Sequence, residues 1–131
     1  MLINIEFNFN NKRSRDFNIK IKKSNHLSIP GRKLEFIEVQ GRTDNLIVDE
    51  GSREMLDIEI EAFIDCRSLN TKTYALRLDE WLNGTNGYSN LTFNDGTKLK
   101  AIFVGQIDFN EVVKNFNEIL LQFKAYRESD L

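Results

Sequence analysis

The sequence predicts a mainly β fold, an antiparallel β-sandwich or barrel of about seven or eight strands with one inserted α-helix over about residues 70–82. Short segments of alternating apolar and polar residues recur along the chain, which is the period of a half-buried strand. Turn residues such as Asn94-Asp95-Gly96 separate these segments. The period becomes helical in one place, after the longest alternating segment. We expect residues 1–131 to form one domain with one core.

The first predicted strand covers residues 2–9, where isoleucines and phenylalanines alternate with polar residues. A polar turn at residues 10–14 follows it. The alternation resumes at Phe17, Ile19 and Ile21. We therefore expect these two segments to pair as a hairpin with an outward polar face.

The next predicted strands are residues 33–39 and a short segment at 46–48. Polar residues separate them, and Gly41 among these residues is suited to positive φ or to a bulge. The run Asp49-Glu50-Gly51-Ser52 is typical of a turn.

The segment from Met55 to Asp65 alternates over its whole length and predicts a long strand. The helix follows it, with Asn70 as the expected N-cap and Asn83-Gly84 at its end. Four residues at helical spacing are expected to anchor the helix in the core: Tyr74, Leu78, Trp81 and Leu82.

The last third of the chain predicts a hairpin and a closing strand. Residues 87–93 and 98–109 flank the Asp95-Gly96 pair, which suits a tight turn. Residues 119–125 form the closing strand, and the irregular pattern at residues 111–117 indicates a bulge before it.

The composition excludes several classes of function. A formal net charge of -2 provides no basic footprint for nucleic acid. The single cysteine, Cys66, has no partner for an internal disulfide, and the single histidine, His26, cannot supply a histidine-based metal site. We expect no cofactor and no metal. The N-terminal residues lack the apolar core of a signal peptide, and no run of residues is long and apolar enough to insert into a membrane.

Two groups of residues resemble catalytic sets, and neither meets the requirements of an enzyme. Asp57, Glu59 and Glu61 share one side of a strand and could act as paired carboxylates, but alternating charges are usually the solvated face of a strand. Ser52, His26 and Asp49 are the residue types of a hydrolytic triad, but no serine in the sequence has the pattern that surrounds a nucleophilic serine. We expect no enzymatic activity.

Four segments taken in order resemble the N-terminal domain of phage distal tail proteins. They are Phe7-Asn8-Phe9-Asn10, Val39-Gln40-Gly41-Arg42-Thr43-Asp44, Trp81-Leu82 and Ile119-Leu120-Leu121-Gln122-Phe123-Lys124-Ala125-Tyr126. The resemblance spans essentially the whole chain. It departs from the family at Gln40, where a proline is usual, and at Asn45, where a glycine is common.

The resemblance implies a virion structural protein of the tail, assembled in the bacterial host cytoplasm. Six copies would form a ring that acts as the distal tail or baseplate hub and joins the tail tube to the host-adsorption apparatus. The implied partners are further copies of the chain, the tail tube protein, and the hub and receptor-binding proteins of the tail. DNA would pass through the channel of the ring without sequence-specific binding.

Two sets of residues are candidates for these roles. The charged segment 40–53 is the expected arm that reaches a neighbouring subunit, with contacts from Gly41, Arg42, Asp44, Asp49, Glu50 and Arg53. The row Asp57, Glu59 and Glu61 is the candidate channel lining, because an acidic or neutral wall does not hold phosphates.

Two alternatives remain open. The charged segment could be a solvated loop of a monomer. The chain could also be a carbohydrate- or peptide-binding module, in which exposed aromatic residues such as Tyr88 and Tyr126 would cluster on one face or loop end.

Overall fold

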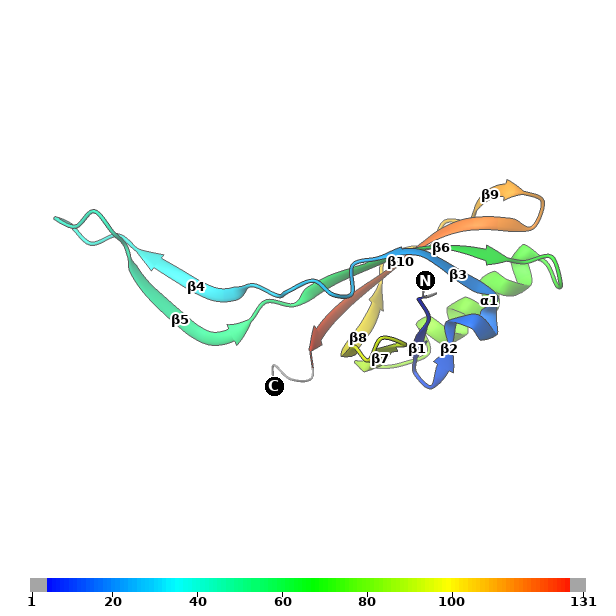
Figure 1. Cartoon of the computed structure of the whole chain (residues 1–131), viewed down its shortest axis with the longest axis horizontal. Helices are drawn as coiled ribbons and strands as arrows, with labels where there is room; N and C mark the ends of the chain where they lie inside the picture. Colours follow the sequence, from blue (N-terminus) through cyan, green and yellow to red (C-terminus); the bar gives the residue numbers. More distant parts are fainter. Residues whose placement is uncertain (1–4, 128–131) are drawn as a thin grey trace.

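The computed structural model of the chain describes residues 5–127 (Figure 1). The first half of the described chain comprises β1 (Phe7–Phe9), β2 (Lys12–Arg13), the 3₁₀ helix η1 (Ser14–Phe17), β3 (Ile19–Ser24), β4 (Arg32–Ile37) and β5 (Leu46–Arg53). The second half comprises β6 (Leu56–Asp65), α1 (Thr71–Leu82), β7 (Ser89–Phe93), β8 (Lys98–Val104), β9 (Asn110–Val113) and β10 (Phe116–Arg127).

The body of the molecule is one antiparallel sheet with the strand order β2-β1-β7-β8-β10-β6-β3, and β9 adds to β10. Its longest pairing joins β6 and β10, which align over ten residue pairs from Phe116↔Asp65 to Ala125↔Leu56. The residues of β6 alternate between buried apolar and more exposed side chains, so one face of the sheet lies on the core.

Helix α1 covers this inner face. Asn70 caps the helix by accepting a hydrogen bond from the Thr73 backbone N–H at 2.8 Å. Trp81 is at the centre of the packing, with its ring stacked on that of Phe17 at a centroid distance of 4.3 Å. The Trp81 Nε1–H donates to the Phe9 carbonyl at 2.7 Å. The indole therefore joins the helix to the sheet through both ring stacking and a buried hydrogen bond.

The second sheet is the two-stranded ribbon of β4 and β5, which projects from the body as a long hairpin (Figure 1). We call residues 32–53 the arm. No other strand among residues 5–127 pairs with either of its strands. The arm therefore meets solvent on both faces and along both edges.

The mainly β fold with one inserted helix is confirmed, and most predicted elements lie where the patterns place them. The helix occupies residues 71–82 and the longest alternating segment forms β6. The Asp95-Gly96 turn joins β7 to β8, with Gly96 at φ 95°. The predicted irregularity near residues 111–117 is a register shift between Phe116 and Asn117, opposite β9.

Two local predictions are wrong. Residues 2–9 do not form a hairpin with residues 17–21: β1 pairs with β2 and β7, whereas β3 pairs with β6 at the other end of the strand order. Residues 1–4 lie outside the described part of the chain. The run Asp49–Ser52 is not a chain reversal, because β5 continues through it to Arg53.

Candidate subunit interface

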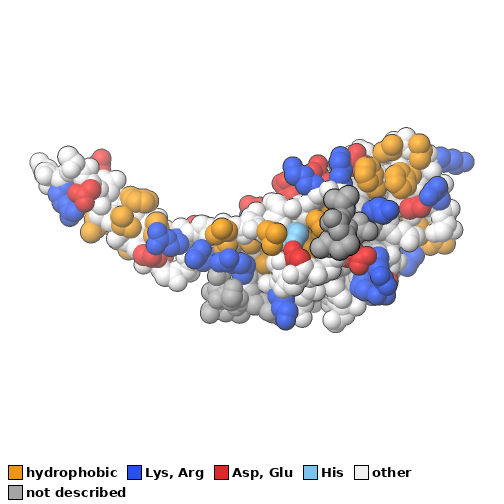
Figure 2. Space-filling model, viewed as in Figure 1, with side chains coloured by type: hydrophobic (Ala, Val, Ile, Leu, Met, Phe, Trp, Pro, Cys, Tyr) orange, Lys and Arg blue, Asp and Glu red, His pale blue; other side chains and the backbone are white. Residues whose placement is uncertain are grey.

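The arm carries large apolar side chains that the chain itself leaves exposed. Phe36 is 60% exposed and Ile47, its cross-strand partner, is 59% exposed. Figure 2 shows hydrophobic side chains along the arm, interspersed with charged ones. The exposed apolar residues of the ribbon and its tip are Phe36, Ile37, Val39, Leu46, Ile47 and Val48.

These apolar residues occupy both faces of the ribbon. Phe36 pairs with Ile47 and the adjacent Ile37 pairs with Leu46, so the two pairs point to opposite faces. An isolated two-stranded hairpin is marginally stable in water. A ribbon with apolar side chains on both faces is therefore a surface suited to burial against another molecule.

The contact residues predicted from the sequence are mainly the charged residues of this segment and do not include the apolar ones. The signal was present: Phe36-Ile37 and Leu46-Ile47-Val48 are consecutive apolar residues, which a strand with one solvated face does not have. Residues 33–39 were predicted as a strand that precedes the arm, whereas β4 (Arg32–Ile37) is the first strand of the arm itself.

The tip of the arm holds three of the predicted contact residues. Gly41 has φ 85° inside a turn that the Arg42 N–H closes onto the Val39 carbonyl at 3.2 Å. Arg42 forms an ion pair with Asp44 at 2.8 Å. The guanidinium and carboxylate of the tip are thus paired within one copy.

The other predicted contact residues lie towards the root of the arm. Gly51 has φ 77° and its N–H donates to Asp49 Oδ1 at 2.8 Å, next to a register shift in the ribbon. Glu50 is exposed. Arg53 donates to the Pro30 carbonyl at 2.9 Å. The turn residues of this run therefore make a bulge that bends the arm near its root.

A buried histidine ties the segment before the arm to the body. His26 is 5% exposed, stacks on the Phe93 ring at 3.9 Å and contacts Ser24 Oγ through Nδ1 at 2.8 Å. Its Nε2 is 2.8 Å from Asp95 Oδ2. Burial opposes ionisation of Asp95, but hydrogen bonds from His26 and Thr97 outweigh it and lower the pKa of Asp95 to about 2.

This Ser24, His26 and Asp95 arrangement differs from the triad considered from the sequence, since His26 contacts neither Ser52 nor Asp49. Ser24 Oγ also accepts from the His26 backbone N–H at 3.3 Å, which is a local turn contact. None of the three residues lines either of the two largest hollows in the described part of the chain, one beside β3 and one between α1 and the end of β8. Its contacts hold the segment before the arm against the β7–β8 turn, and we call Ser24, His26 and Asp95 the latch.

The row Asp57, Glu59 and Glu61 lies on the outer face of the sheet, away from the helix. Lys124 of β10 forms an ion pair with Asp57 at 2.6 Å. Lys22 pairs with Glu118 on the same side at 3.4 Å. The carboxylates are therefore accompanied by lysines, and the face carries both signs of charge.

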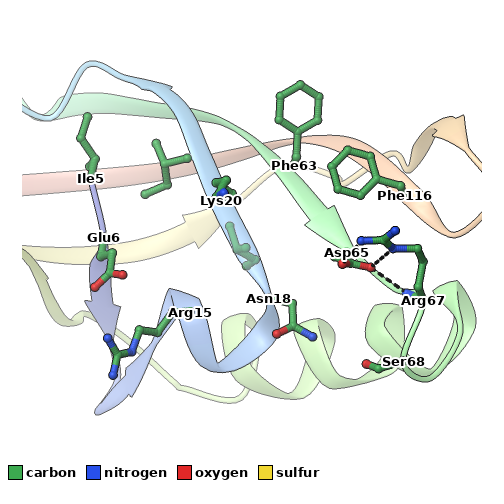
Figure 3. A pocket seen from close by; sticks show the side chains of 12 residues that line it. Ile5, Glu6, Arg15, Asn18, Lys20, Phe63, Asp65, Arg67, Ser68 and Phe116 are labelled. Carbon is green, nitrogen blue, oxygen red and sulfur yellow. Dashed lines mark hydrogen bonds and ion pairs between the residues drawn. The ribbon is translucent and has the colours of Figure 1, made fainter. Parts of the chain in front are cut away.

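An open groove of about 810 Å³ follows the free edge of β3 (Figure 3). Ile5, Ile19 and Ile21 contribute apolar surface to it. Phe63 and Phe116 stack on each other at 5.6 Å and lie at its opposite side.

The charged residues that line this groove are the cations Arg15, Lys20 and Arg67 and the carboxylates Glu6 and Asp65. Arg15 and Lys20 line it and are exposed. Asp65 accepts hydrogen bonds from the side chain and backbone of Arg67, which lower its pKa to about 2. Asp65 thus stays ionised and paired.

The remaining candidate residues lie elsewhere. Tyr74, Leu78, Trp81 and Leu82 are all buried under the sheet. Cys66 is buried as well, and burial raises the pKa of its thiol. Tyr88 and Tyr126 contact each other edge to face at 5.2 Å, beside Met55.

Residues 5–127 contain no group of three or more histidine, cysteine, aspartate or glutamate side chains placed to hold a metal ion. No helix in this range has the length and hydropathy needed to cross a membrane.

Comparison with known proteins gives one informative result. No protein-family model matches the sequence, and no curated protein matches it. The structure is similar to that of the SPP1 phage Dit (gp 19.1) protein, described as a paradigm of the hub adsorption apparatus in phages that infect Gram-positive bacteria. The TM-score is 0.74 at 12% sequence identity, over 96% of this chain and 50% of the Dit chain. The described chain thus spans about half of the Dit protein, and the resemblance to distal tail proteins noted in the sequence is confirmed at the level of the fold.

Proposed function

We propose that this chain is a structural component of a phage tail, which assembles into a ring at the distal end of the tail tube. The observation that carries the proposal is the arm, whose apolar side chains are exposed on both faces in a single copy. The similarity of the fold to the SPP1 Dit protein supports a role in a tail hub. In this role the chain acts by geometry and subunit contacts, without catalysis or a cofactor.

The energetics of the arm favour a closed assembly over a pair. Fully burying one large apolar side chain contributes about 1.5–3 kcal/mol, so covering six that are half exposed contributes gross stabilisation on the order of 6 kcal/mol. Association costs about 4–15 kcal/mol in lost freedom of motion. One arm contact therefore does little more than offset this cost. When a ring closes, its last arm contact joins two copies that already belong to the same assembly, so the association cost is not incurred again. This stabilises the closed ring over open intermediates.

We infer that six copies form the ring and that Gly41, Arg42, Asp44, Asp49, Glu50 and Arg53 belong to the arm contact. In the same proposal the outer face with Asp57, Glu59 and Glu61 lines the channel. Lys124 and Lys22 pair with Asp57 and Glu118 and leave Glu59 and Glu61 to keep the wall acidic, which does not hold phosphates. The expected neighbours are the tail tube protein and the hub and receptor-binding proteins of the virion.

Solution mass tests the proposal. Light scattering of the wild-type chain over a series of concentrations should show monomers and one large species, with little between them. The double variant Phe36→Asp and Ile47→Asp should remain monomeric, because it places a charge pair on one face of the arm. As a matched control, Leu76→Asp changes a side chain of equal exposure (59%) on the helix and should assemble as the wild type does. Equal assembly of the arm variant and the wild type would refute the role of the arm.

A binding module is the second candidate, and one observation favours it. Tyr88 and Tyr126 lie side by side at the surface, as that alternative predicts. Their rings are 75° apart, so they do not form the shared flat platform on which a sugar ring stacks. Binding of glycans or peptides by a monomer, abolished by Tyr88→Ala, would support this candidate over the ring.

A further inference from the structure

The arm consists of two segments that are separated by a break in its ladder. At the root, Arg32 pairs with Arg53, and the next partners along the ribbon are Leu34 and Asp49. Between these two pairs β4 has one residue, whereas β5 has the three residues 50–52. The extra residues interrupt the ladder as a bulge does. We call residues 34–49, on the far side of this break, the outer arm.

The root of the arm is tied to the body from both strands. The Glu54 N–H donates to the Gly31 carbonyl at 2.7 Å. Arg53 donates to the carbonyl of Pro30, which is itself buried. Four residues earlier, the latch holds His26 against the β7–β8 turn. The residues on the body side of the break are therefore fixed by contacts that do not depend on the outer arm.

The outer arm has no such ties. Within the described part of the chain, the hydrogen bonds and ion pairs of residues 34–49 all join them to other residues of the arm, such as Arg42 with Asp44 at the tip and Arg32 with Asp49 across the break. β4 and β5 pair only with each other, and the ribbon extends away from the body (Figure 1). The outer arm thus depends on its own ladder of four residue pairs.

A ladder of this kind is marginally stable by itself. Residues 38–45 join its strands, and this loop is longer than the about two to five residues of most hairpins, which raises the entropy cost of closing it. The apolar pair Phe36 and Ile47 is mostly exposed, so it removes little surface from water. In contrast, β6 is paired on both sides and buries alternate side chains. The outer arm therefore needs far less free energy to open than the body does.

We propose that the outer arm of a free copy opens and closes independently of the body, with residues 50–52 as the boundary, and becomes fixed only when another molecule covers it. The opening is a property of one copy and goes beyond the proposed function. Its effect on assembly rests on the proposed function: a binding surface that is closed for part of the time has an apparent dissociation constant raised by the reciprocal of the closed fraction. Free copies then associate weakly in pairs.

Amide hydrogen exchange tests the opening, followed residue by residue by NMR at a concentration where light scattering shows single copies. The amides of residues 34–37 and 46–49 that bond across the ladder should exchange within about tenfold of the rate of an unstructured peptide, and those of β6 at least about a thousandfold more slowly. The Glu54 N–H, on the body side of the break, should exchange at least about tenfold more slowly than the outer arm. Outer-arm amides as strongly protected as those of β6 would overturn the proposal.

A crosslink across the ladder provides a matched comparison. Glu35 and Val48 are cross-strand partners and both are exposed, so Glu35→Cys with Val48→Cys can form a disulfide, while the native Cys66 is buried. The oxidised variant should protect the outer-arm amides at least about tenfold more than the same variant in its reduced form, and it should assemble at a concentration lower by a similar factor. Equal protection in the two forms would show that the outer arm is already closed and would overturn the proposal.

The opening and the ring can fail separately. Rings that form from single copies whose outer arm is strongly protected would overturn the opening and leave the ring in place. Single copies at every concentration, with fast exchange in the outer arm that the crosslink slows, would support the opening and reject the ring.

Discussion

Replacement of Trp81 by alanine is the most severe single change that the structure predicts for the fold. The side chain is 2% exposed, stacks on Phe17 and contacts Phe7 at a centroid distance of 5.7 Å. Loss of a buried tryptophan costs about 3–5 kcal/mol through lost burial and the remaining cavity. The Phe9 carbonyl also loses its donor, which by itself costs about 1–3 kcal/mol. We expect a total loss of about 4–6 kcal/mol in the free energy of unfolding, since the two effects overlap.

The assay is urea unfolding followed by far-ultraviolet circular dichroism, because Trp81 is the single tryptophan and its removal abolishes the fluorescence signal. Domains have total stabilities of about 5–15 kcal/mol, so Trp81→Ala could unfold the chain. Trp81→Phe retains an aromatic ring without the hydrogen bond, and we expect it to lose about 1–3 kcal/mol. Leu76→Ala, on the exposed side of the same helix, should change stability by less than about 0.5 kcal/mol. A loss below about 1 kcal/mol for Trp81→Ala would refute the placement of the indole in the core.

Three further predictions concern the arm, the latch and the outer face. Phe36→Asp with Ile47→Asp should abolish the large species in light scattering and change the free energy of unfolding by less than about 1 kcal/mol, since both side chains are exposed; a larger loss would mean that the arm is part of the core. Asp95→Asn should lower the free energy of unfolding above pH 4, as measured in urea titrations. The difference in this free energy from the wild type should shrink between pH 4 and pH 2, because the folded chain loses the interactions of the ionised carboxylate as the pH falls to the Asp95 pKa of about 2. A difference that does not change with pH would contradict this. Glu59→Lys with Glu61→Lys should make assembled rings retain duplex DNA at low salt in a gel-shift assay, and unchanged retention would argue that this face does not line the channel.

The elements that the sequence predicts well are those set by local pattern. The helix at 71–82 follows from the spacing of its apolar residues and from the Asn70 cap, and β6 follows from its unbroken alternation. In both elements the buried residues are set by periodicity, whichever element packs against them.

The errors occurred where the partner of a segment decides its structure. Alternation in residues 2–9 and 17–21 fits a strand at either end of the sheet, so it does not specify that β1 pairs with β7 and β3 with β6. Asp49-Glu50-Gly51-Ser52 has the residues of a turn, but the pairing of β4 with β5 continues through it and converts them into a bulge.

The candidate interface was found in part for the same reason. The charges of residues 40–53 predict the arm from the sequence. The apolar residues that distinguish the arm from a solvated loop have the pattern of an ordinary strand. Their exposure becomes visible only when the pairing partners of β4 and β5 are known, because a strand in the body would have buried one face. The β3 groove likewise is lined by residues that lie far apart in the sequence, from Ile5 to Phe116, and only the folded sheet brings them together.

Electron microscopy of the heaviest species in solution distinguishes a ring from every other assembly. We expect closed rings with six-fold symmetry and a central opening, built from copies joined head to tail through their arms. Two-fold dimers, open filaments or single copies at every concentration would contradict it.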